Sequence, residues 1–226
     1  CAGHRRAAEL IMARLVADLG GTNCRLALVA EGGQSFSQSF VSSKSYRNEE
    51  FANFNDLISR YLADAGAPKI SAMVIAVAGP VSGEAAQLTN RGWRISAQEL
   101  STQLNGRPVH LLNDLSALGH SLPMLRGDDL IQIHSAYDTT IKPQKLVIGI
   151  GTGFNLSPLT VTETGVTCLE AEYGHVALPL DLYQALANRL GDQAAEFRTV
   201  ECCFSGRGFE ALYAAFSPDA PALPAA

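Results

Sequence analysis

Cysteine, runs of positive charge and long apolar stretches are all scarce in this chain of 226 residues. The five cysteines are Cys1, Cys24, Cys168, Cys202 and Cys203, an odd number without C-x-x-C spacing. This disfavours a disulfide framework and a zinc site, and it favours a reduced, cytoplasmic protein. No apolar stretch reaches the roughly 18 residues of a membrane-spanning helix, so we expect no membrane partner.

The net charge is −5 and the chain has no long basic run. An acidic chain is a poor match for a phosphate backbone, so we expect no nucleic-acid partner. Arg14 interrupts the apolar stretch near the N-terminus, which disfavours a secretory signal peptide. We interpret residues 1–11 as a disordered extension before Met12 or a translation-start artefact, and the Pro/Ala-rich residues 217–226 as a disordered tail.

Between these ends, the apolar pattern predicts two α/β units, at 12–123 and 124–216. Each unit opens with two strands joined by a glycine turn, at 14–30 and at 145–161. Glycine suits such a turn because it accepts positive φ at low cost. The other predicted elements are helices at about 46–64, 96–104, 181–190 and 205–216, a helix starting near Asp114, and buried strands at 70–79 and 108–114.

Two of the predicted helices carry capping residues. Ser96 and Glu99 form the pattern of a capping box, and Ser205 is expected to cap the last helix. Four residues of that last helix repeat at helical spacing and are expected to face the core: Phe209, Leu212, Tyr213 and Phe216.

The two glycine turns are suited to a nucleotide's phosphates. They read Gly20-Gly21-Thr22 and Gly151-Thr152-Gly153. Only glycine lets backbone N–H groups approach phosphate oxygens closely, and one turn per unit would hold ATP in a cleft between the units. Transfer of the phosphoryl group also needs a carboxylate that organises Mg²⁺ through water, a role that Asp18 can fill. The alternative is that both turns are only tight hairpins.

Asp114 is the best candidate for a general base. It follows "VHLLN" at the carboxyl end of a buried strand, and open α/β sheets bind ligands at the carboxyl ends of their strands. The alternative is that Asp114 only caps the next helix, because aspartate is a favoured N-cap.

A second polar cluster lies at 170–176, where Glu172 and His175 flank Gly174. A carboxylate and an imidazole can hydrogen-bond sugar hydroxyls, although a structural histidine is the alternative. A metal site lacks a second histidine at a ligand spacing. Glu201 can be a simple helix-start carboxylate, and Arg25 can simply brace the first hairpin.

Seven segments, taken in this order, resemble the bacterial ATP-dependent glucokinase family: "DLGGTNCR" (18–25), "AVAGPV" (76–81), "LTNRGW" (88–93), "LLNDLSALG" (111–119), "GIGTGF" (149–154), "EYGH" (172–175) and "ECCFSGRG" (201–208). The resemblance is collinear over about residues 12–216, and the combination is more specific than any single motif. It implies an α/β, ribonuclease H-like (actin-like ATPase) two-domain sugar kinase. The implied reaction is ATP-dependent phosphorylation of D-glucose, by a protein that is a homodimer at full length.

The resemblance also implies roles for individual residues. Asp114 matches the general base that deprotonates the 6-hydroxyl of the sugar. The positions that match sugar contacts are Asn113, Glu172, His175 and Glu201, with Asn90 in a sugar-proximal segment. Asp18, Gly20, Gly21 and Thr22 match the first phosphate motif, and Gly151, Thr152 and Gly153 match the second.

Some positions depart from the family pattern. Phe154-Asn155 stands where Leu-Gly is common, Tyr173 replaces a usual glycine, and Arg207 replaces a usual proline. The chain also ends before the part that carries the family's adenosine-binding motif. We therefore expect an incomplete second domain and a truncated gene product or fragment, which binds ATP weakly at best.

The sequence leaves three alternatives open. An inactive glucokinase-derived fragment would bind sugar without turnover. A sugar-binding regulator would need a DNA-binding module, for which the residues before the first strand are too few. A kinase for another hexose would carry a cysteine-rich zinc motif after His175, and the sequence there reads "VALPLDLYQ".

Overall fold

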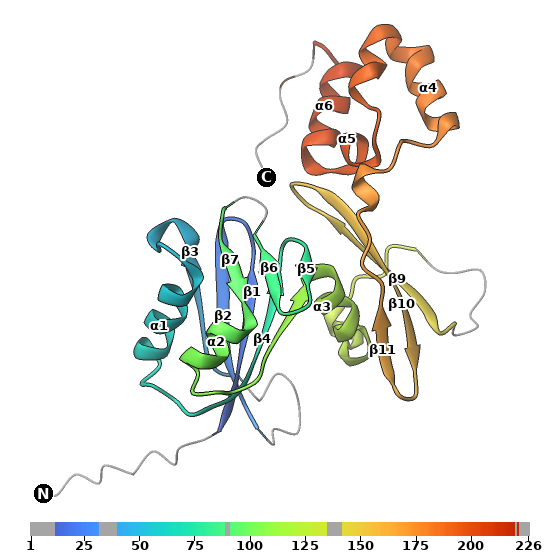
Figure 1. Cartoon of the computed structure of the whole chain (residues 1–226). Coiled ribbons are helices and arrows are strands. Elements are labelled where there is room, and N and C mark those ends of the chain that lie inside the picture. Colours follow the sequence, from blue (N-terminus) through green and yellow to red (C-terminus); the bar gives the residue numbers. More distant parts are fainter. Residues whose placement is uncertain (1–11, 32–39, 89–90, 135–141, 220, 222–226) are drawn as a thin grey trace, which may run out of the picture. The chain divides into compact units, whose positions relative to one another are not determined.

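The computed structural model describes residues 12–31, 40–88, 91–134, 142–219 and 221. The expectations for residues 1–11, for Asn90 and for most of the 217–226 tail therefore lie outside the described residues. The chain divides into two compact units, Cys1–Asp114 and Leu115–Ala226, which we call unit 1 and unit 2 (Figure 1).

The division falls before the boundary predicted at residue 123. The reason is the packing of helix α3 (Asp114–Ser121), whose residues after Asp114 lie against unit 2. The helix lies close to the sheet of unit 2 at Gly119, where an added Cβ would lie 2.7 Å from Cys168 Sγ and 3.2 Å from Leu159 Cδ2.

Unit 1 is built on a five-stranded sheet with the strand order β3-β2-β1-β4-β8. Strands β1 and β2 form an antiparallel hairpin, β3 continues it, and β4 and β8 run parallel to β1. The predicted hairpin and the two predicted buried strands are all present. The bounds are β1 Ala13–Leu19, β2 Asn23–Ala30, β3 Phe40–Arg47, β4 Ile70–Val77 and β8 Val109–Asn113.

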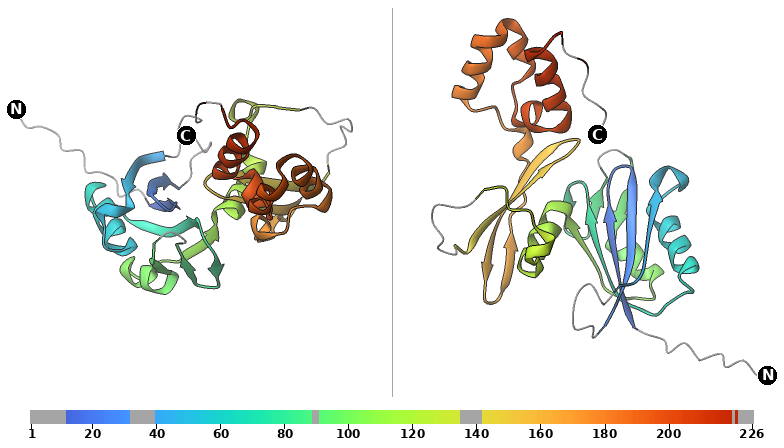
Figure 2. Two further views of the ribbon diagram at one scale, coloured as in Figure 1. Left: turned by 90° about the horizontal axis from the view of Figure 1, so that it is seen from above. Right: turned by 180° about the vertical axis from the view of Figure 1, so that it is seen from behind.

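Helices α1 (Phe54–Asp64) and α2 (Ala97–Gln103) contact each other and pack on this sheet (Figure 2). The Gln103 side chain donates to Asn55 O (3.1 Å) and Ser59 Oγ (2.8 Å). Alternate residues of β1 point into the core beneath the helices, so Leu15 and Leu19 are buried while Asp18 is exposed on the opposite face. The sheet thus places the Asp18 carboxylate where a ligand can reach it.

The helix predicted at 46–64 is shorter than expected. Tyr46 belongs to β3, where it pairs with Cys24, and Asn48 begins the 3₁₀ turn η2 (Asn48–Glu50). The helix starts at Phe54 because the Asn53 side chain caps it, accepting a hydrogen bond from the Asp56 N–H (2.9 Å).

Unit 1 also contains a small antiparallel sheet that was not predicted from the sequence. It has the order β5-β6-β7, with β5 at Val81–Ser82, β6 at Ala85–Gln87 and β7 at Arg94–Ser96. Its last residue, Ser96, caps α2 as predicted, accepting a hydrogen bond from the Glu99 N–H (3.3 Å). The capping serine therefore follows a strand directly, without an intervening loop.

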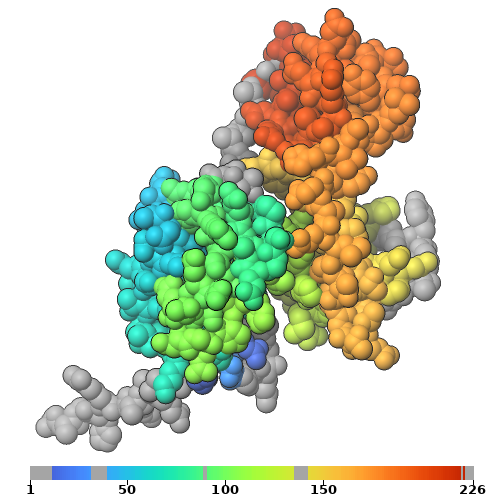
Figure 3. Space-filling view, viewed as in Figure 1, coloured from blue at the N-terminus to red at the C-terminus, as the bar shows by residue number. Residues whose placement is uncertain are grey.

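Unit 2 contains an antiparallel sheet with the order β11-β10-β9 and three helices that pack around Phe197 and Cys203. The segment with these helices is orange to red in the space-filling view of Figure 3. The predicted second hairpin is present as β9 and β10, whereas β11 and α5 were not predicted. The bounds are β9 Gln144–Ile150, β10 Phe154–Thr162, β11 Gly165–Cys168, α4 Leu180–Leu190, α5 Val200–Phe204 and α6 Gly206–Phe216. Short 3₁₀ turns lie at η3 Leu122–Met124, η4 Gly127–Asp129, η5 Tyr173–His175 and η6 Gly191–Glu196.

The core face predicted for α6 is only partly correct. Ser205 caps this helix, since its Oγ accepts a hydrogen bond from the Gly208 N–H (3.1 Å). Leu212 packs against the core cluster of unit 2. Phe209 and Phe216 are 45% and 44% exposed, so the helical period alone assigned them wrongly.

The described cysteines, Cys24, Cys168, Cys202 and Cys203, are all free thiols. Among the residues that the structure describes, no helix combines the length and the apolar character that crossing a membrane would require.

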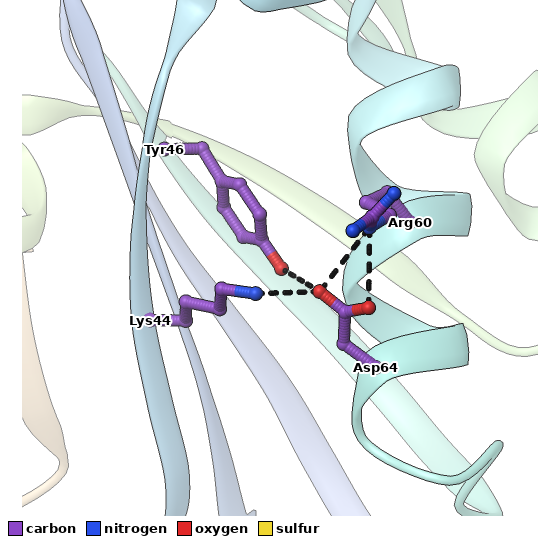
Figure 4. A network of polar contacts seen from close by, with 4 residues as sticks. All are labelled: Lys44, Tyr46, Arg60 and Asp64. Atoms are coloured by element: carbon purple, nitrogen blue, oxygen red, sulfur yellow. Dashed lines mark hydrogen bonds and ion pairs between the residues drawn. The ribbon is translucent and has the colours of Figure 1, made fainter.

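A polar network joins β3 to the end of α1 (Figure 4). Asp64 Oδ2 accepts hydrogen bonds from Lys44 Nζ (2.5 Å) and the Tyr46 hydroxyl (3.1 Å), and Asp64 Oδ1 accepts one from Arg60 Nε (3.1 Å). The hydrogen bond from Lys44 is the main cause that lowers the pKa of the Asp64 carboxyl, and Tyr46 and Arg60 act in the same direction.

This network predicts a loss of stability in acid. Because the folded pKa of Asp64 is lowered, the unfolded chain binds more protons, so the stabilisation exists above about pH 4 and disappears as pH falls through the folded pKa. Asp64→Asn should lower the urea midpoint of unit 1 at pH 7, and the gap from the wild type should close towards about pH 3. Trp93, the only tryptophan, reports this unfolding by fluorescence. The gap should narrow in a Lys44→Gln background, where Tyr46 and Arg60 still donate to Asp64, and an unchanged gap there would contradict the pairing with Lys44.

Strand β9 exposes apolar side chains on one face, and we expect the chain to self-associate through this face. Leu146, Ile148 and Ile150 are each more than half exposed on an edge strand, while Val147 between them is buried. An exposed apolar edge strand is a site of association between chains. We expect Ile148→Lys to lower the weight-average mass in sedimentation velocity at high protein concentration, and Leu182→Lys, at an exposed leucine of α4, to have a smaller effect. Equal effects of the two variants would show that this face is not where the chains meet.

Candidate functional site

The first glycine turn is held from below by a buried asparagine. Asn48 Nδ2 donates to the carbonyl oxygens of Gly20 (2.8 Å) and Gly21 (3.1 Å), and the Asn48 N–H donates to Thr22 O (2.9 Å). Gly20 and Gly21 are not among the described residues with positive φ, so the positive φ expected of this turn is absent. Space beside Gly20 is limited, because an added Cβ would lie 3.3 Å from Asn23 O.

Asp18 and Arg25 face each other across the β1–β2 hairpin. They are register partners, and Arg25 Nη1 lies 3.3 Å from Asp18 Oδ2. Both side chains are more than half exposed, so the pair contributes at most about 1 kcal/mol and leaves the carboxylate accessible. Burial raises the pKa of the neighbouring Cys24 thiol to about 12, and the Asp18 charge adds to this, so Cys24 stays protonated and unreactive.

The carboxyl ends of three parallel strands meet at one edge of the sheet in unit 1. Leu19 of β1 is in register with Val77 of β4, which is in register with Asn113 of β8. Strand spacings of about 4.8 Å place the first glycine turn roughly 10 Å from Asn113. Asp114 directly follows Asn113 as the first residue of α3 and is partly exposed.

The loop after β4 belongs to the same edge. The Asn113 Nδ2 donates to Gly79 O (3.3 Å), and the Ala78 N–H donates to Leu19 O (2.9 Å). This edge therefore brings together Asp18, the first glycine turn, Asn113 and Asp114, at the end of the strands where open α/β sheets bind ligands.

The second glycine turn, in unit 2, lies on the start of α6. The Gly151 N–H donates to Gly153 O (2.9 Å) and closes the turn, while the Gly206 N–H donates to Gly151 O (2.7 Å). Thr152 is at the tip of the turn and is exposed. An added Cβ at Gly206 would lie 3.0 Å from Gly151 O, so the close approach of helix and turn depends on glycine at this position.

Glu201 of α5 joins this turn to the rest of unit 2. Its Oε2 accepts a hydrogen bond from the Phe154 N–H (3.1 Å), and its Oε1 is paired with Arg207 Nη2. Added Cβ atoms at Gly153 and Gly174 would lie 2.8 Å and 3.2 Å from Glu201 Oε2. Two glycines thus leave space for one largely buried carboxylate.

Glu172 lies two residues before Gly174 in the chain and is exposed. Asn155 Nδ2 donates to Glu172 Oε2 (3.4 Å), and Asn155 Oδ1 accepts from the Tyr173 N–H (2.9 Å). His175 ends η5 and is exposed. The predicted Glu172, Glu201 and second glycine turn therefore share one surface of unit 2.

Three supporting residues were not found by sequence reasoning: Asn48, Gly79 and Asn155 in its contact with Glu172. For Asn48 the sequence holds one local signal against the predicted helix at 46–64, because asparagine is unfavourable inside a helix. Asn155 and Arg207, both departures from the family pattern, each contact one of the predicted sugar-binding carboxylates. Asn90 lies outside the described residues.

A family model described as Glucokinase matches residues 15–225. The chain belongs to the glucokinase family. The glucokinase of Caulobacter vibrioides (strain NA1000 / CB15N) is 33% identical over 205 residues, covering 88% of this chain and 60% of that protein. The chain therefore spans about three fifths of the length of this curated relative.

Two solved structures extend the comparison. Glucokinase from an Antarctic psychrotroph has 28% identity and a TM-score of 0.74, covering 91% of this chain and 64% of its own. Glucokinase from Balamuthia mandrillaris in complex with glucose has 25% identity and a TM-score of 0.68, covering 92% and 63%. These likenesses confirm the predicted family and the α/β fold of the ribonuclease H-like, actin-like ATPase class for this glucokinase family member.

Proposed function

We propose that this chain is the catalytic part of an ATP-dependent glucokinase, which transfers a phosphoryl group from ATP to D-glucose and forms glucose 6-phosphate. The family match over residues 15–225 carries the proposal. It is supported by the sheet edge that gathers Asp18, the first glycine turn and Asp114. A glucokinase of this kind acts in the cytoplasm, where free thiols such as Cys202 stay reduced. A homodimer of the full-length protein is part of the same proposal.

Asp114 is the proposed general base, which accepts the proton of the attacking 6-hydroxyl. Asn113 is beside it and, with Glu172, His175 and Glu201, is proposed to bind the sugar hydroxyls, as is Asn90. Carboxylates accept two or more hydrogen bonds each, so Glu201 can bind a hydroxyl while it keeps the Phe154 N–H.

The glycine turns are proposed to bind the phosphates of ATP through backbone N–H groups. Asp18 fits Mg²⁺ held through water, because Mg²⁺ in such enzymes takes one or two carboxylates together with substrate phosphates. The described residues contain no group of three or more His, Cys, Asp or Glu side chains that could hold a metal ion. When bound, Mg²⁺ neutralises charge on the phosphates.

A direct test uses two proteins: the 226-residue chain, and this chain extended by the part of the Caulobacter glucokinase that lies beyond the match. Formation of glucose 6-phosphate is measured with ATP and glucose, and glucose binding is measured by calorimetry. The proposal predicts turnover by the extended protein and glucose binding by both. Failure of both proteins to bind glucose would contradict it.

The alternative for the 226-residue chain is an inactive glucokinase-derived fragment that binds sugar. It predicts glucose binding without turnover by that chain. Turnover by the chain alone at the rate of the extended protein would exclude this candidate.

A further inference from the structure

Arg207 lies between two predicted parts of the site in unit 2, the second glycine turn and Glu201. It is the second residue of α6, after Gly206, whose N–H contacts the second glycine turn. Its guanidinium is paired with Glu201, whose carboxylate is only 18% exposed, while the Arg207 side chain is 72% exposed. One arginine therefore reaches from solvent to a largely buried carboxylate that contacts the turn.

The contacts of Glu201 divide between its two oxygens. Oε2 accepts from the Phe154 N–H, which is the first backbone donor after the glycine turn. Oε1 takes the Arg207 guanidinium. A carboxylate held at one oxygen alone can rotate about its last torsion, which is a broad one. A second partner on the other oxygen removes this freedom.

We propose that Arg207 is a positioning residue: it holds the Glu201 carboxylate against the Phe154 N–H and thereby sets the second glycine turn and the sugar-binding carboxylate together. The inference deepens the proposed function and rests on it for the sugar-binding role of Glu201. The steric space agrees, because Gly153 and Gly174 leave the carboxylate room on the side that Arg207 does not cover.

Exchange of the Phe154 amide proton tests the positioning in the free protein. In the isotope-labelled 226-residue chain, Arg207→Gln should speed this exchange by about threefold or more, because an ion pair with one exposed partner contributes up to about 1 kcal/mol. Arg207→Lys should restore much of the protection, since the cation is kept. Arg198→Gln, which removes an exposed arginine just before α5, is the matched control and should change nothing at Phe154.

Two results would overturn the proposal. One is unchanged exchange at Phe154 in Arg207→Gln. The other is equal acceleration in Arg207→Gln and Arg207→Lys, accompanied by acceleration at the Gly208 amide, because this would show that the start of α6 has loosened instead.

Glucose affinity tests the functional half separately. Calorimetry should show that Arg207→Gln weakens glucose affinity about threefold or more. Arg207→Lys should restore the affinity, and Arg198→Gln should leave it unchanged. Unchanged affinity in Arg207→Gln would overturn the link to sugar binding. If neither the wild-type chain nor the extended protein binds glucose, the proposed function fails, and the exchange of the Phe154 amide still decides whether Arg207 positions Glu201.

Discussion

Replacing Asp114 with asparagine is expected to lower the kcat of the extended glucokinase about 10²- to 10⁴-fold, the usual contribution of a general base. Asparagine keeps the size and polarity of the side chain but cannot accept the proton of the 6-hydroxyl. Glucose affinity should stay close to that of the wild type, because the change removes an interaction made mainly in the transition state. The measurement is steady-state formation of glucose 6-phosphate together with calorimetric glucose binding.

Asp192→Asn is the matched control, since Asp192 is an exposed aspartate of η6 outside the proposed site. It should leave kcat and affinity unchanged. If Asp114→Asn retains most of kcat, the base lies elsewhere, and the helix-start interpretation of Asp114 gains weight. If glucose affinity falls in parallel with kcat, Asp114 contributes to binding and not only to proton transfer.

Replacing Gly174 with alanine is expected to destabilise unit 2 by about 3 kcal/mol, at the upper end of overpacking effects. The added Cβ would lie 2.2 Å from Phe154 O, which is backbone and cannot turn aside as a side chain would. Relief requires η5 to separate from β10, and Glu201 would lose its space at the same time. The measurement is urea unfolding followed by far-UV circular dichroism, which sees both units.

Trp93 lies in unit 1, so its fluorescence provides an internal reference. The fluorescence midpoint should move little in Gly174→Ala while the circular dichroism midpoint falls. Gly127→Ala is the control, because a Cβ there would meet open space and the backbone φ is not positive. Equal midpoints for Gly174→Ala and Gly127→Ala would contradict the close approach of η5 to β10.

The sequence predicted best where the signal is local. The hairpins of β1–β2 and β9–β10, the buried strands β4 and β8, and the caps of α2 and α6 all depend on residues within a few positions of one another. Apolar runs, glycines between them and capping serines carry these signals.

Elements that depend on distant partners were missed or misplaced. Strand β3 is mostly polar and exposed, and it is a strand because β2 offers it a partner. The start of α1 moved from residue 46 to Phe54 for the same reason, since Tyr46 and Asn48 are committed to contacts with β2 and the first glycine turn. The inward period of α6 failed at Phe209 and Phe216 because periodicity does not say which part of a face is covered.

The sequence alone determined the family, the two glycine turns and the chemical types of the candidate site residues, because each is carried by short segments in a fixed order. Only the tertiary structure decided what holds those residues: Asn48 under the first turn, Arg25 beside Asp18, and Arg207 with Phe154 on Glu201. Two of these contacts join residues that are remote in the chain: Asn48 and Gly20 are 28 positions apart, and Phe154 and Glu201 are 47 positions apart. A hydrogen bond forms where folding brings donor and acceptor within about 3 Å, and no local pattern encodes that distance.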